Sequence, residues 1–263
     1  MPTSKATSKK TAKTKPGRSV PLLGIALILS LSILAYIRWL NGQVPDSAQK
    51  IEDSPTIVVA APISLPKPSL TSRTSVEAAM QTRRSRRDFT GDSLNIKQVG
   101  QMLWSAQGVT TDWGGRTAPS AKSAYPLTVY LVATKVIDLA PGIYQYLPGE
   151  REAVHQIQLI KQGDLHTVIG TAIGQNAATN PPALIIIAAD MAKMAKAFDG
   201  VRNDNNVYLE VGHAAQNMYL QAESLGLGMV SMAGFDGTKV AAAAGIPANE
   251  TIIYAIPFGI PKP

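Results

Sequence analysis

The sequence contains no cysteine and only three histidines among its 263 residues. Without cysteine the chain can build no disulfide framework, thiolate nucleophile, iron–sulfur cluster or cysteine-ligated zinc site. His155, His166 and His213 stand without a second His, Asp or Glu at the spacing that a zinc or non-haem iron site requires. The sequence therefore predicts that the protein holds no metal.

Short catalytic motifs are missing as well. There is no G-x-S-x-G elbow, so a Ser-His-Asp hydrolase is poorly supported. There is also no P-loop and no G-x-G-x-x-G turn, so a Rossmann nicotinamide domain has no signature. The apolar fraction of 45% nevertheless excludes a disordered chain, and the length allows one or two domains with a full-sized core.

The net charge of +7 is concentrated at one end of the chain. Residues 1–18 contain no acid and six basic side chains, namely Lys5, Lys9, Lys10, Lys13, Lys15 and Arg18. From residue 19 onward, 19 basic residues face 18 acidic ones. Because the remainder is nearly neutral, its charge gives no support to nucleic-acid binding.

Residues 19–40 form an apolar stretch that predicts a single transmembrane anchor. Tyr36 and Trp39 would lie at the membrane interface. A cleaved signal peptide is the alternative, but the run is long and its end makes a poor cleavage site, which favours an uncleaved anchor. The preceding positive charges place the N-terminus in the cytoplasm and the bulk of the chain on the other side. The opposite orientation, with the domain facing the cytoplasm, remains the alternative.

Five prolines between residues 41 and 70 predict a semi-extended stalk, in which 56–60 could form a short strand. The domain order is therefore a basic tail (1–18), an anchor (19–40), a stalk (41–70) and a globular domain (71–263).

Helical and strand-like patterns alternate through the globular part, as expected for an α+β or α/β domain. Strands are predicted at 127–133, 142–146, 183–189, 227–233 and 251–259. Helices are predicted after an N-cap at Ser75, at 96–106 before Gly108, at 205–225 before Gly226, and from Asp236 to 244.

Three segments could carry chemistry. Residues 83–87 hold four arginines and a serine, a composition that suits a phosphate but that also occurs on solvated surfaces. Residues 116–126 form a loop of small and hydroxylated residues, which could also be an ordinary turn. In the long predicted helix, Gln216 and Asn217 interrupt an apolar pattern, so these amides either bond to a ligand or neighbouring chain or face solvent.

In this order, the segments resemble the nitroreductase family of flavoproteins, and within it the SagB/ThcOx-type dehydrogenases. The resemblance covers about residues 75–262 and is carried by RRSRRDF (83–89), PSAKSAYPLTVYLV (119–132), GHAAQNMYLQAESLGLG (212–228), GFD (234–236) and PFG (257–259). It implies an α+β fold with a mostly antiparallel central sheet flanked by helices. It also implies a homodimer with two FMN molecules at the subunit interface.

The resemblance assigns site residues by position. Arg83, Ser85 and Arg87 would hold the flavin phosphate and ribityl chain, with backbone contacts from Arg84. Pro119, Ser120, Ala121 and Ser123 would approach the flavin from the second subunit. Ser231, Met232, Ala233 and Gly234 would follow the isoalloxazine edge, where a backbone N–H would reach N5. Lys262 matches the region of a C-terminal phosphate ligand. No catalytic side chain is expected, because the flavin carries the chemistry.

The expected activity is FMN-dependent hydride transfer in a ping-pong cycle, with NAD(P)H or a small organic molecule as donor. Ala233 stands where nitro-reducing members often carry an acid, which favours the dehydrogenase branch. Residues 193–198 lack the Lys-Tyr pair associated with azoline oxidation, which argues against a peptide-modifying dehydrogenase. Three alternatives remain: the peptide-modifying dehydrogenase, a flavin-binding protein with little turnover, and a structural membrane-stalk protein without a cofactor.

Overall fold

The computed structural model describes residues 36–39 and 61–263. Residues 36–39 are helical and belong to a unit separate from the compact one that starts at Val58. The predicted basic tail, most of the predicted anchor and the possible strand at 56–60 lie outside the described residues. Within the described part of the chain, no helix has the length and apolar character needed to cross a membrane.

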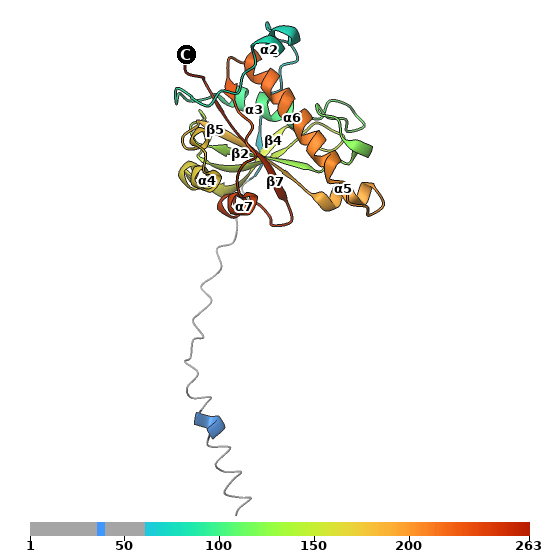
Figure 1. The fold of residues 1–263 in the computed structure, drawn as a ribbon, viewed down its shortest axis with the longest axis vertical. Coiled ribbons are helices and arrows are strands. Elements are labelled where there is room, and N and C mark those ends of the chain that lie inside the picture. The colour runs from blue at the N-terminus through green and yellow to red at the C-terminus, as the bar shows by residue number, and fades with distance from the viewer. Residues whose placement is uncertain (1–35, 40–60) are drawn as a thin grey trace, which may run out of the picture. The chain divides into compact units, whose positions relative to one another are not determined.

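A seven-stranded sheet organises the described residues of the compact unit (Figure 1), and every pairing between its strands is antiparallel. The order is β1-β4-β3-β2-β5-β7-β6. The strands are β1 (Ile63–Ser64), β2 (Leu127–Ala133), β3 (Gly142–Leu147), β4 (Gln156–Gln162), β5 (Ala183–Ala189), β6 (Gly228–Met229) and β7 (Thr251–Gly259). The expected α+β fold with a mostly antiparallel sheet is confirmed.

The central strand β5 explains why its sequence is a continuous apolar run. It pairs with β2 on one side and β7 on the other, and all seven of its residues are buried. Its side chains alternate between two cores: Ile185 and Ile187 enter one, while Leu184 and Ile186 enter the other. Helices cover both faces, so neither set of side chains meets water.

The helices are distributed over the two faces of the sheet. Residues of α3 (Ile96–Gln107) and α6 (Asp204–Ser224) belong to the first core, and residues of α4 (His166–Ile173) and α7 (Gly237–Ala244) belong to the second. The shorter helices are α2 (Val76–Thr82), which contacts α6, and α5 (Met191–Ala197). A long α6 lying across one face is the element on which the site is built.

The predicted helix caps are present. Ser75 accepts a hydrogen bond from the Ala78 amide and begins α2, and Asp236 accepts from two amides at the start of α7. Gly108 follows α3 as predicted. Local sequence therefore set these helix ends.

Three features differ from the sequence-based expectation or extend it. The predicted strand at 227–233 forms regular pairing only at β6, because the next residue of β7 is Pro257, which has no N–H to donate across the ladder. The elements β4, α4 and α5 were not predicted. In the range predicted as a stalk, β1 pairs with β4 and Leu65 is buried.

Candidate functional site

The arginine-rich segment lies along the edge of the sheet. After α2 ends at Thr82 the chain becomes extended, Ser85 bridges to Met229, and the Arg86 amide donates to the Met229 carbonyl at 2.9 Å. Gly228 permits this approach, since a Cβ there would lie 2.9 Å from two carbons of the Arg86 side chain. The backbone of the arginine segment is thus held against β6 at Ser85 and Arg86.

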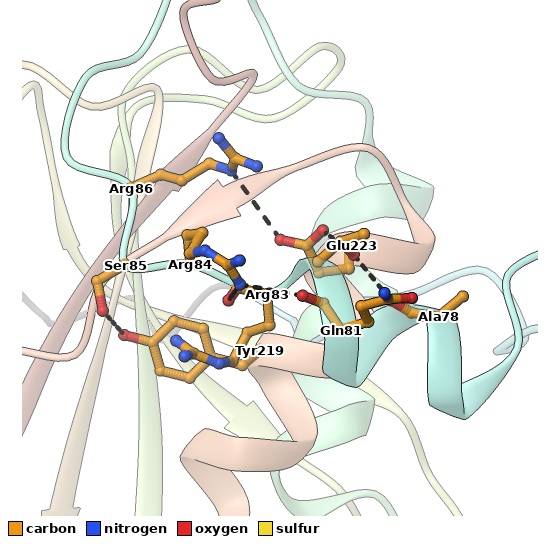
Figure 2. Close-up of polar contacts among 9 residues, drawn as sticks. Ala78, Gln81, Arg83, Arg84, Ser85, Arg86, Tyr219 and Glu223 are labelled. Atoms are coloured by element: carbon orange, nitrogen blue, oxygen red, sulfur yellow. Dashed lines mark hydrogen bonds and ion pairs between the residues drawn. The ribbon is translucent and has the colours of Figure 1, made fainter.

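The positive charge of this segment is mostly uncompensated (Figure 2). Arg86 Nε lies 4.0 Å from a carboxylate oxygen of Glu223. Arg83, Arg84 and Arg87 have no acidic partner among the described residues. Arg84 donates to the carbonyls of Gln81 and Arg83, at 3.0 and 2.8 Å. Such a cluster favours an anionic ligand with several acceptor oxygens.

Tyr219 of α6 connects the arginine segment to the segment after β6. Its hydroxyl lies 3.2 Å from Ser85 Oγ and accepts the Ser231 amide at 3.0 Å, while the Arg83 guanidinium lies over its ring, 5.1 Å from the centroid. Figure 2 shows the ring between Ser85 and Arg83. One side chain therefore joins three predicted site residues.

The segment 231–234 offers polar groups that the protein itself does not use. Ser231 Oγ is buried and has no hydrogen-bond partner among the described residues. The Ser231 and Met232 amides donate to Tyr219 and Ala255, but those of the exposed Ala233 and Gly234 have no partner in the described structure. The Met232 side chain is buried in the second core, and its backbone N–H and C=O both pair with Ala255, so Met232 offers no unused polar group.

The C-terminal segment runs beside the arginine segment. The Lys262 amide donates to the Asp88 carbonyl at 3.0 Å, and Phe89 bridges to Pro261. A cavity of about 480 Å³ lies between the segments and is lined by Arg84, Ser85, Arg86, Arg87, Asp88, Lys262 and Pro263. The structure thus brings Lys262 to the arginine cluster.

The loop with Pro119, Ala121 and Ser123 lies elsewhere on α6. Ser120 Oγ donates to Glu210 at 2.5 Å, and Glu210 lies nine residues before Tyr219 on the helix, a rise of about 13.5 Å. Within one chain, this loop is therefore not part of the arginine site. The amide of Asn217 bonds inside the chain, to the Thr117 carbonyl at 2.9 Å, and Gln216 is exposed.

Sequence reasoning missed three polar side chains of α6 that organise these regions: Glu210, Tyr219 and Glu223. Tyr219 and Glu223 stand inside a quoted motif, but nothing in the sequence shows which residues they contact. Their spacing of four residues, which places them on one helix face, was the available signal. No group of His, Asp or Glu that could hold a metal occurs in the described ranges.

The uncompensated arginines, the unpartnered Ser231 hydroxyl and the two free amides together fit a phosphate-bearing ligand with a polar ring edge. FMN has both parts, so the residues present are compatible with it.

Comparison with known proteins gives consistent results. The profile of the Nitroreductase family matches residues 80–260. A Methanocaldococcus jannaschii protein provisionally named a nitroreductase is 35% identical over 165 residues, covering 63% of this chain and 81% of that protein.

Among solved structures, a provisionally named nitroreductase from Ralstonia eutropha JMP134 has a TM-score of 0.65 and 27% identity, covering 77% of this chain and 90% of that one. A chain in the Escherichia coli microcin synthetase McbBCD complex has a TM-score of 0.55, with 92% of this chain and 97% of that chain covered. At 18% identity it shows a common fold alone. By its sequence profile and its fold, the chain belongs to the nitroreductase family.

Proposed function

We propose that this protein is an FMN-dependent oxidoreductase. The observation that carries the proposal is the meeting at Tyr219 of the uncompensated arginine segment and the segment 231–234 with its unused polar groups. The two segments are more than 140 residues apart in sequence, yet one hydroxyl links them.

The arginine segment would hold the FMN phosphate. Arg83, Arg87 and Lys262 supply positive charge without acidic partners among the described residues, and the Ser85 hydroxyl supplies a further donor. The Arg83 side chain is oriented by the Tyr219 ring, so less side-chain entropy is lost when it binds an anion. Arg84, held on two carbonyls, would contribute through its backbone.

The segment after β6 would orient the flavin ring. The amides of Ala233 and Gly234 are the donors that remain free, so one of them is the candidate partner of N5, and Ser231 Oγ can bond to the ring edge. Bound FMN supplies the hydride chemistry, with NAD(P)H or a small organic molecule as the proposed donor. The protein itself then needs only to bind the flavin, to orient it and to leave one of its faces open.

We further propose a homodimer in which residues 119–123 complete the partner's site. The loop is too far from the arginine cluster of its own chain to serve it. An unpartnered face of α6 supports the association: Leu209 is 60% and Tyr208 50% exposed, and Gly212, His213 and Gln216 follow on the same face. Two copies joined through this face would cover these apolar groups.

The branch and location are also part of the proposal. Ala233 and the fold shared with a chain of the microcin synthetase complex support the SagB/ThcOx-type branch. Because the Lys-Tyr pair is missing, a small-molecule substrate is preferred to a peptide.

The basic tail and residues 19–40 support a single-pass membrane anchor with a cytoplasmic N-terminus, and protease accessibility on intact spheroplasts would show which face carries the domain.

The test is to purify the full chain, record its visible spectrum, and titrate it with FMN. We expect tight FMN binding, followed by loss of the visible flavin band when a competent donor is added without oxygen. Protein that stays colourless and takes up no FMN contradicts the proposal. FMN-loaded protein that neither NADH nor NADPH reduces would favour another donor or a flavin-binding protein with little turnover.

The variant Arg83→Gln tests the phosphate assignment. Losing a charge-assisted hydrogen bond of about 1.5–3 kcal/mol should weaken FMN binding by roughly 10- to 100-fold. Arg151→Gln removes the same charge from the exposed connection between β3 and β4 and should leave FMN affinity unchanged. Equal affinities for the two variants would refute the assignment.

A further inference from the structure

Away from the arginine cluster, α6 buries a carboxyl group. Glu210 is only 2% exposed, and no cation lies within ion-pair distance of it in the described residues. Its Oε2 accepts a hydrogen bond from Ser120 Oγ at 2.5 Å, and its Oε1 accepts one from Gln107 Nε2 at 3.4 Å. A buried carboxyl with such partners needs an explanation, because burial of the charge is unfavourable.

Ser120 is the residue through which Glu210 acts on the loop 119–125. Its Oγ accepts the Tyr125 amide at 2.8 Å while donating to Glu210, so it closes the loop and ties it to α6. Inside the loop, Lys122, Ser123 and Tyr125 have φ angles of 51°, 53° and 45°. Side-chain-bearing residues rarely adopt this left-handed conformation, so the loop must be held by its contacts.

We propose that Glu210 is a positioning residue: through Ser120 it holds the loop 119–125 in the conformation that completes the flavin site of the partner subunit. The inference rests on the proposed function, since it concerns the same site. It adds a residue that lies outside the site and acts most strongly when it is ionised, because the charge-assisted bond to Ser120 weakens on protonation.

The surroundings of Glu210 place this ionisation near neutral pH. Burial raises its pKa to about 7, while hydrogen bonds from Ser120 and Gln107 and the charges of Arg116 and Lys193 oppose that rise. Arg116 is linked to Glu210 through Gln107, to which its Nη1 donates at 2.9 Å, and its guanidinium lies over the Tyr125 ring. Lys193 Nζ donates to the Tyr125 carbonyl at 3.0 Å. The network thus joins the carboxyl to both ends of the loop.

The test compares the full-length wild type with Glu210→Gln at roughly pH 5.5 and pH 8.5, on either side of the ionisation. Because the FMN phosphate titrates in this range too, the quantity compared is the ratio of variant to wild-type Kd for FMN. We expect a ratio of about ten at the higher pH, where a charged acceptor is lost, and near one at the lower pH. Glu250→Gln is the matched control. Glu250 is a half-buried carboxyl that accepts a hydrogen bond from Tyr130, and the Kd ratio of this variant to wild type should stay near one at both pH values.

Hydrogen exchange of residues 119–125 gives a readout that needs no flavin. Relative to wild type at the same pH, Glu210→Gln and Ser120→Ala should speed exchange of the Tyr125 amide at the higher pH, and the double variant should add little. If the wild type binds no FMN, the proposed function is contradicted. The hydrogen-exchange measurement then still tests whether Glu210 positions the loop. Unchanged exchange in Glu210→Gln, or a Kd ratio that does not depend on pH, overturns the inference. Should Glu210→Gln not fold, Glu210→Asp, which keeps the charge but withdraws the carboxylate from Ser120 Oγ, decides by the same exchange measurement.

Discussion

Replacing Tyr219 by Phe tests the link between the arginine segment and the segment after β6. The change keeps the ring under Arg83 and removes only the hydroxyl, which lies 3.2 Å from Ser85 Oγ and accepts the Ser231 amide at 3.0 Å. Leaving a buried donor unsatisfied costs about 1–3 kcal/mol. Because Ser231 is only partly buried, the lower part of this range, about 1–2 kcal/mol, is expected.

This cost should appear in both stability and binding. Unfolding in urea should show a loss of about 1–2 kcal/mol, and the melting temperature should fall by roughly 2–8 °C for a domain of this size. If the hydroxyl also positions the FMN site, the Kd for FMN should rise by about 5- to 30-fold.

The control is Tyr144→Phe, which removes a hydroxyl that donates to the Ala140 carbonyl at 2.7 Å between β2 and β3. It should cost similar stability and leave FMN affinity unchanged. The reasoning is refuted if Tyr219→Phe and Tyr144→Phe have the same FMN affinity, since the hydroxyl of Tyr219 would then be structural only.

Further predictions concern pH, helix capping and association. The folded-state pKa of Glu210, raised to about 7 from 4.5, means that wild-type stability declines as pH rises from about 4.5 to about 7, by roughly 3 kcal/mol from this group. Glu210→Gln should lack this decline in urea unfolding at about pH 5 and pH 8, and an identical slope in both proteins would be inconsistent with the shift. Asn95→Ala removes the capping box of α3 and should cost about 1 kcal/mol by the same assay, whereas no loss would show that the cap is dispensable. Leu209→Arg should convert the proposed dimer to a monomer in light scattering, and a dimer that persists would place the interface elsewhere.

Local sequence determined much of the secondary structure. The strands β2, β5 and β7 have the predicted ends, because each is an apolar run and neighbouring prolines and glycines limit several of the ends. By contrast, β4 has half-exposed polar residues and carries no comparable pattern. Its pairing with β3 and β1 is decided by the rest of the sheet.

For the candidate site, the sequence by itself determined the residue types: four arginines around Ser85, and the segments that resemble a flavoprotein family. The tertiary structure decided that Tyr219 joins Ser85 to Ser231, that Lys262 lies beside the arginines, and that the loop containing Ser120 bonds to Glu210 instead. Composition and spacing act over a few residues, whereas these contacts join segments up to about 180 positions apart. They depend on β6 pairing with β7 at the sheet edge and on α6 crossing the same sheet. No local sequence pattern predicts either arrangement.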